Sequence, residues 1–225
     1  MSGAAPSGVR RVGVKVCGIR DEVGLDAAID AGVDWVGFVF FARSPRVVTP
    51  REASRLHARL QGRIPSVGLF VEPDDAEIAL VLETVPLEIL QLYTDPDRAA
   101  AVRARFGLPV WLAHGVSGRE QLPRESRADG LVIESRPPRD ANRPGGNGVA
   151  FDWSILAGWS APAPWLLAGG LTADNVGSAI AASGAPAVDV SSGVESRPGQ
   201  KDADLIRRFV SAARGGPGAV SSPAG

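Results

Sequence analysis

The chain has 225 residues, with 24 basic and 25 acidic side chains that give a formal net charge of −1. Its composition, 44% hydrophobic and 22% charged, is typical of a globular protein with a substantial core. Balanced charge excludes a strongly basic surface for nucleic acid or an anionic membrane, and no apolar run approaches the ~20 residues of a membrane span. We therefore expect a soluble, cytoplasmic protein with no nucleic-acid or membrane partner.

Short apolar runs rich in strand-forming residues alternate with amphipathic segments along the chain. Strands are predicted at 12–17, 35–40, 66–70, 88–92, 110–113, 130–134, 165–168 and 188–190. Helices are predicted near 21–31, 50–60, 74–84, 96–106, 152–157, 172–183 and 202–212. Thr49 and Thr172 are expected to cap two of them. Pro123 interrupts a further helical segment at 118–127.

Eight strands, each followed by a helix-sized segment, indicate parallel pairing through crossover connections. Two architectures fit this order, a closed (β/α)8 barrel and an open doubly wound sheet. The open sheet is expected to carry a G-x-G-x-x-G turn after an early strand, which this sequence lacks. We therefore predict a single (β/α)8 TIM barrel over residues 10–213. The Gly-, Ala-, Pro- and Ser-rich ends, 1–9 and 214–225, are expected to be flexible tails.

The first strand ends with two polar residues, and functional groups in barrels lie at the C-terminal ends of strands. Lys15 and Cys17 share one face, whereas Val14 and Val16 share the other. Because the apolar face packs against helices, Lys15 and Cys17 are expected to point into the barrel. A small packing residue is the alternative role for Cys17. As the only cysteine, it also excludes a disulfide and a multi-cysteine metal site, and we expect no bound metal.

Three more polar residues follow or end predicted strands. Arg46 lies after the second strand, where an arginine can bind a carboxylate through two parallel hydrogen bonds or simply be solvated. Glu134 ends the apolar sixth strand, and a carboxylate there costs free energy unless it is paired, hydrogen-bonded or protonated. It is therefore a candidate acid or base, or the partner of Arg136 or Arg139. His114, at the end of the fifth strand, is a further candidate base.

The last two predicted strands end in loops of small residues, at Gly169, Gly170, Ser191, Ser192 and Gly193. Backbone N–H groups in such loops form anion cradles, and barrels often bind phosphate after strands 7 and 8. Two tight turns without a ligand are the alternative. Asp189, in the eighth strand, can hydrogen-bond a sugar hydroxyl or serve the barrel itself.

Several of these strand ends belong to a set of ordered motifs. They include VKVCGI at 14–19, GFVF at 37–40 with SPR at 44–46, VGLFV at 67–71, LAGGL at 167–171, and DVSSGVE at 189–195 with KD at 201–202. Spread in order over residues 12–212, the set resembles phosphoribosylanthranilate isomerase, a family of tryptophan biosynthesis. The resemblance implies a monomeric or homodimeric barrel without a cofactor, acting on a small phosphorylated substrate. The implied reaction is an Amadori rearrangement of N-(5-phosphoribosyl)anthranilate to 1-(o-carboxyphenylamino)-1-deoxyribulose 5-phosphate.

The resemblance also implies site roles. Cys17 would be the general base, Glu134 the general acid, and Arg46 the group that binds the anthranilate carboxylate. The loops near Gly170 and Ser192 would bind the phosphate, and we count Lys15 and Asp189 with the substrate-binding residues. Lys15 is further expected to lower the pKa of the Cys17 thiol from about 8.5, while the apolar strand end raises that of Glu134 from about 4.3.

The sequence departs from the family pattern at three places. Glu134 stands where the family has aspartate, Tyr93 where it has histidine, and Asn147 where it has threonine. The segment after Glu134 also contains Asp140, a possible substitute acid. These differences leave two alternatives open: a paralogue redirected to another phosphorylated sugar-amine or aromatic substrate, or a non-catalytic barrel that binds a phosphate ligand.

Overall fold

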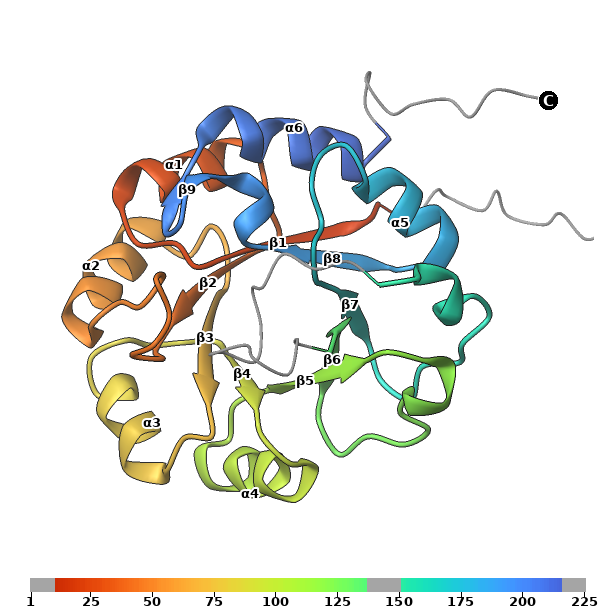
Figure 1. The fold of residues 1–225 in the computed structure, drawn as a ribbon. Coiled ribbons are helices and arrows are strands. Elements are labelled where there is room, and N and C mark those ends of the chain that lie inside the picture. Colours follow the sequence, from red (N-terminus) through yellow and green to blue (C-terminus); the bar gives the residue numbers. More distant parts are fainter. Residues whose placement is uncertain (1–10, 137–150, 216–225) are drawn as a thin grey trace, which may run out of the picture.

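The computed structural model describes residues 11–136 and 151–215. In this part of the chain, eight parallel strands close into a barrel in sequence order, with β8 paired to β1 (Figure 1). The strands are β1 (Gly13–Cys17), β2 (Trp35–Val39), β3 (Ser66–Val71), β4 (Ile89–Tyr93), β5 (Val110–Val116), β6 (Gly130–Ser135), β7 (Trp165–Leu167) and β8 (Ala187–Val190). The predicted TIM barrel and all eight predicted strands are therefore confirmed.

Six α-helices surround the barrel in the described residues: α1 (Glu22–Asp30), α2 (Pro50–Leu60), α3 (Asp75–Leu82), α4 (Pro96–Phe106), α5 (Val176–Ser183) and α6 (Ala203–Ala213). Thr49 caps α2 as predicted, in a reciprocal pair with Glu52. Thr172 does not cap α5. The Asn175 side chain instead accepts from the Thr172 N–H and donates to the Gly170 carbonyl, and the helix begins only at Val176.

The connections after β5 and β6 differ from the prediction. The segments expected to be helical at 118–127 and 152–157 form only short 3-10 turns, η1 (Arg119–Gln121) and η2 (Trp153–Leu156). Pro123 explains the first case because it cannot continue a helix. After β8 the chain adds a 3-10 turn, η3 (Ser192–Val194), and a hairpin of β9 (Glu195–Arg197) and β10 (Gln200–Lys201), none of which the sequence pattern predicted.

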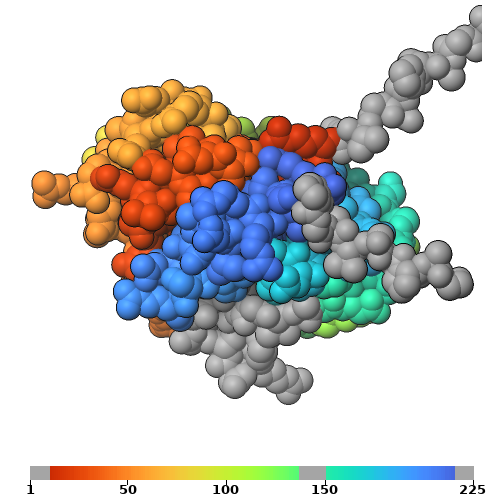
Figure 2. All heavy atoms as spheres, turned by 90° about the horizontal axis from the view of Figure 1, so that it is seen from above, coloured from red at the N-terminus to blue at the C-terminus, as the bar shows by residue number. Residues whose placement is uncertain are grey.

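The two ends of the barrel segment pack together. Helix α6, blue, lies against α1, red-orange, and so closes the ring of helices (Figure 2). Arg214 strengthens this closure by donating to the Gly32 carbonyl and to Asp34, each at 2.9 Å. The expected tails otherwise lie outside the described residues.

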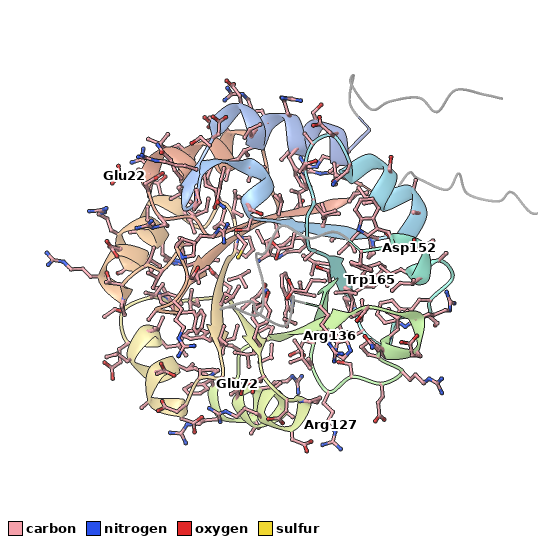
Figure 3. The ribbon with its side chains drawn as sticks, viewed as in Figure 1. Glu22, Glu72, Arg127, Arg136, Asp152 and Trp165 are labelled. Carbon is pink, nitrogen blue, oxygen red and sulfur yellow. The ribbon has the colours of Figure 1, made fainter. Side chains whose placement is uncertain are left out.

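The barrel interior is layered, and this layering positions the site. Trp111 fills the lower interior, with Trp35 edge-on to it at 5.4 Å between ring centroids. Above this apolar layer lie Lys15 and Asp189, which are directly opposite each other in the β1–β8 register. Charged side chains such as Glu22 and Arg127 extend instead from the outer surface (Figure 3). Within the described residues, no helix combines the length and apolarity that crossing a membrane requires.

Candidate active site

A pocket opens at the C-terminal ends of the strands, which is where active sites lie in barrels of this type. Most of the residues predicted from the sequence line it: Cys17, Arg46, Glu134, Gly169, Gly170, Asp189, Ser191 and Ser192. Lys15 lies one step deeper on β1 and is fully buried, and Gly193 supports the pocket from behind. The structure thus brings the predicted residues together at one end of the barrel.

Cys17 and Lys15 point into the barrel, as the alternation along β1 predicted. The Lys15 ammonium donates to Asp189 at 2.9 Å, and Gly37 on β2 leaves space beside the Cys17 sulfur that a Cβ would fill. Burial raises the pKa of Cys17, the charge of Lys15 lowers it, and the carboxylate of Asp189 raises it. Lys15 therefore acts in the expected direction, but burial outweighs it, and the pKa of the thiol lies above its ordinary value rather than below it.

Glu134 is 5% exposed and faces the same pocket from β6. Burial raises its pKa to about 8, and a hydrogen bond from the Tyr93 phenol opposes that rise. The alternative ion pair with Arg136 does not form in the described structure, where Arg136 is exposed. The remaining possible partner, Arg139, and the substitute acid Asp140 lie outside the described residues, as does Asn147. A carboxyl group that keeps its proton near neutral pH can act as an acid.

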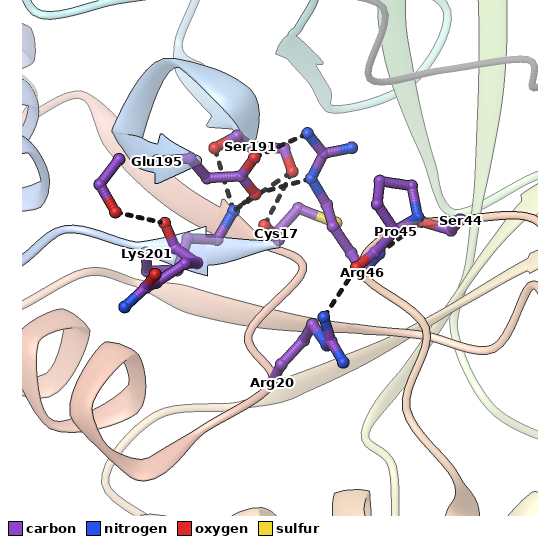
Figure 4. Close-up of polar contacts among 10 residues, drawn as sticks. Cys17, Arg20, Ser44, Pro45, Arg46, Ser191, Glu195 and Lys201 are labelled. Carbon is purple, nitrogen blue, oxygen red and sulfur yellow. Dashed lines mark hydrogen bonds and ion pairs between the residues drawn. The ribbon is translucent and has the colours of Figure 1, made fainter. Parts of the chain in front are cut away.

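Arg46 lines the pocket, but its guanidinium is already paired with a carboxylate of the protein, which the sequence analysis did not predict. Its Nε and Nη2 donate to the two carboxylate oxygens of Glu195 at 2.7 and 2.9 Å (Figure 4). Within the described residues, Nη1 has no protein partner and is left for a ligand. Sequence reasoning gave Glu195 and its neighbour Lys201 no role, although both stand in the motifs that carry the family resemblance.

The two glycine-containing loops meet behind the pocket. Gly169 and Gly170 both have positive φ, 89° and 66°, which favours glycine. A Cβ on Gly193 would collide with the carbonyl oxygen of Leu171, so the loops after β7 and β8 can approach only because residue 193 is glycine. In the described part of the chain, the amide N–H groups of Gly170 and Gly193 donate to no other protein group. They are therefore available to an anion.

Of the other polar side chains, His114 lies away from the pocket, whereas Tyr93 lines it. The Nε2 atom of His114 contacts the Gln121 carbonyl at 2.8 Å, and His114 does not line the pocket, so the suggestion of a base there is not supported. Tyr93, named only as a departure from the family, does line the pocket and faces Glu134. Gln91 is fully buried inside the barrel, and its amide has no hydrogen-bond partner in the described structure.

The closed barrel gathers a thiol, a buried carboxyl group and two glycine-containing loops at the C-terminal ends of its strands, which is the architecture of a TIM-barrel enzyme. The family model of N-(5'-phosphoribosyl)anthranilate (PRA) isomerase matches residues 14–212. The chain belongs to this family.

Individual relatives agree with this assignment. The N-(5'-phosphoribosyl)anthranilate isomerase of Acidiphilium cryptum is 57% identical over 200 residues, covering 88% of this chain and 97% of the relative. That of Paracoccus denitrificans is 53% identical, covering 90% and 97%. A crystal structure of TrpF from Jonesia denitrificans superposes with a TM-score of 0.78 at 37% identity, covering 91% and 97%. Another, of phosphoribosyl anthranilate isomerase with reduced 1-(o-carboxyphenylamino)-1-deoxyribulose 5-phosphate bound, has a TM-score of 0.75 at 32% identity, covering 91% and 99%.

Proposed function

We propose that this protein isomerises N-(5'-phosphoribosyl)anthranilate, with Glu134 as the general acid and Cys17 as the general base. One observation carries the proposal: a carboxyl group that is protonated near neutral pH and the single thiol of the chain face one pocket from different strands. Acid–base isomerisation needs both groups in place at once. The comparisons give no support to a redirected paralogue or to a non-catalytic barrel.

The first step is ring opening. Glu134 donates its proton to the furanose ring oxygen, the bond from that oxygen to C1 breaks, and the nitrogen lone pair forms the C1–N iminium. Glu134 is left as a carboxylate, which the phenol of Tyr93 stabilises through its hydrogen bond. Because the carboxyl group is buried, its proton stays on the acid until the reaction requires it.

The second step is removal of the C2 proton. The Cys17 thiolate takes it, and the electrons of the C–H bond form the C1–C2 double bond while the C1–N π electrons return to nitrogen. The resulting enolamine tautomerises to the keto product: C1 takes a proton from the Cys17 thiol, and the C2 hydroxyl returns one to the Glu134 carboxylate, so both groups regain their starting states. Burial has the largest effect on the pKa of Cys17 and opposes the thiolate, as Asp189 does, whereas the ammonium groups of Lys15 and Lys201 favour it.

Binding residues divide the substrate between two ends of the pocket. The free Nη1 edge of Arg46 suits the anthranilate carboxylate, since a guanidinium binds carboxylates with strong, oriented hydrogen bonds. The amides of Gly170 and Gly193, with Ser192 beside them, suit the phosphate. Lys15 lies deeper in the barrel, where it donates a hydrogen bond to Asp189 and lowers the pKa of Cys17. A monomeric or homodimeric state, activity without a cofactor and a cytoplasmic location stay predictions.

The direct test uses the fluorescence of phosphoribosylanthranilate generated in situ. We expect the purified protein to remove this fluorescence at enzymatic rates, on the order of 1–10³ turnovers per second. A folded protein that leaves the fluorescence unchanged would contradict the proposal. The same experiment with unrelated phosphorylated sugar-amines is the control, and turnover of those compounds alone would favour the redirected paralogue.

Tyr93→Phe tests the environment of the acid. The hydrogen bond from Tyr93 lowers the pKa of Glu134, so its removal raises that pKa further. Activity is lost at high pH when Glu134 loses its proton. The high-pH limb of the kcat/KM profile should therefore move to higher pH, and turnover at pH 7 should stay within about tenfold of the wild type. An unchanged limb, or one that moves to lower pH, would show that Tyr93 does not act on the acid.

A further inference from the structure

A buried group of charges links the β2–α2 loop to the β9–β10 hairpin at the mouth of the barrel. We call Arg46, Glu195 and Lys201 the clasp cluster (Figure 4). Their side chains are 6%, 4% and 1% exposed, respectively. Arg46 belongs to the β2–α2 loop, whereas Glu195 and Lys201 belong to the β9–β10 hairpin. Two cations thus share one carboxylate, which leaves the cluster with a net charge of +1.

Lys201 connects the clasp cluster to the phosphate end of the pocket. Its ammonium donates to Glu195 at 2.8 Å, to the Ser191 carbonyl at 3.0 Å and to the Ser191 hydroxyl oxygen at 3.3 Å. The Ser191 hydroxyl in turn donates to the carbonyl of Cys17 at 3.0 Å. The cluster is therefore continuous, through hydrogen bonds, with the backbone of the residue that carries the thiol.

Close backbone packing holds the same loops together. Gly18 has a φ of 79°, and a Cβ there would meet Arg46 Cδ at 2.5 Å, so the arginine stem lies directly over the turn after Cys17. Gly199, at the tip of the hairpin, has a φ of 82°, and a Cβ on it would collide with the Pro45 carbonyl oxygen. That carbonyl also accepts from Arg20 at 2.9 Å. The packing against Gly18 restricts the aliphatic part of the Arg46 side chain, and the hydrogen bonds to Glu195 set the orientation of its guanidinium group.

We propose that Glu195 is a positioning residue that orients Arg46 for the aromatic carboxylate of the substrate. Lys201 links the Glu195 carboxylate to Ser191, and so positions Ser191 at the phosphate end. The clasp cluster thereby fixes the separation between the two binding ends of the pocket. This inference rests on the proposed function. Glu195 holds Nε and Nη2 in a side-on pair, which leaves Nη1 without a partner among the described residues and available to a ligand. Neither Glu195 nor Lys201 is among the described residues that line the pocket.

The test measures two fragment ligands by NMR titration, so that it does not depend on turnover. Anthranilate probes the carboxylate end, and inorganic phosphate probes the other. In Glu195→Gln, which keeps the side-chain shape, we expect the dissociation constant for anthranilate to rise about tenfold, with a smaller change for phosphate. In Lys201→Met the Arg46–Glu195 pair remains, so we expect the reverse pattern. Glu195→Asp should recover part of the anthranilate affinity.

The double variant Glu195→Gln/Lys201→Met is the matched control for charge, because it removes one anion and one cation and keeps the net charge of the cluster at +1. The double variant also replaces Glu195→Gln in the test if that single variant, which leaves two unpaired buried cations, fails to fold. A persistent defect in anthranilate binding supports the proposal. Unchanged anthranilate binding in this variant, equal losses for both ligands in each single variant, or a wild type that does not bind anthranilate would overturn it.

Turnover separates this proposal from the proposed function. If Glu195 acts on binding, Glu195→Gln should raise KM for the substrate about tenfold and change kcat much less. A fall in kcat alone, with KM unchanged, would contradict a positioning role. A wild type that binds anthranilate and phosphate but does not isomerise the substrate would instead contradict the proposed function and leave the clasp cluster supported.

Discussion

Cys17→Ala should reduce turnover of phosphoribosylanthranilate by on the order of 10³- to 10⁴-fold while the barrel stays folded. The reason is that Cys17 is the only thiol of the chain and lines the same pocket as Glu134, so its loss removes the proposed base. The fluorescence assay measures the loss, and circular dichroism with thermal unfolding measures the fold. Loss of one small sulfur atom beside Gly37 should change stability only modestly.

Two controls separate a base from a packing residue. Cys17→Ser keeps the size and polarity of the side chain but offers a group that does not ionise near neutral pH, so it should be nearly as inactive as Cys17→Ala. Inorganic phosphate should bind both variants as it binds the wild type. Full activity in either variant would exclude Cys17 as the base and return it to the packing role considered at the outset.

Elements whose residues obey a simple period were predictable. The alternation of Lys15 and Cys17 with Val14 and Val16 predicted which side chains enter the barrel, and the structure confirms it. Helix α2 was also predictable, because its Thr49 cap and Pro50 are local signals. The start of α5 was not, since Asn175 overrides Thr172 through a hydrogen bond to Gly170 that no local pattern specifies.

Site residues held by long-range contacts were harder to find. Arg46 and Glu195 are 149 positions apart, and the sequence gives no reason to pair them before the barrel brings β8 beside β1. The net pKa shift of Cys17 was also not predictable: Lys15 lowers this pKa as expected, but burial raises it by more, and Asp189, which faces Lys15 across the β1–β8 register, raises it as well. Glu134 was easier, because an apolar strand implies burial of its last carboxylate.

The second large effect is expected for Glu134→Gln, which should reduce kcat by on the order of 10²- to 10⁴-fold, because glutamine is similar in shape but has no proton to give to the ring oxygen. Glu134→Asp should retain more activity than Glu134→Gln yet less than the wild type. Shortening the side chain by one methylene moves the carboxyl group away from Tyr93 and the substrate, and a shift near 1 Å lowers the rate by about 100-fold. Wild-type rates in Glu134→Gln would exclude Glu134 as the acid.

Stability provides an independent readout of the same group. The pKa of Glu134 is raised from 4.5 to about 8 in the folded protein, mainly by burial. Between those two pH values the folded state keeps a proton that the unfolded chain releases, so the wild type should lose stability as pH rises through this window. Glutamine does not titrate, and Glu134→Gln should lack that loss. In denaturant unfolding, the free energy of unfolding of Glu134→Gln relative to that of the wild type should therefore be higher at pH 8 than at pH 5. An equal difference at the two pH values would mean that Glu134 is already ionised and cannot serve as the acid.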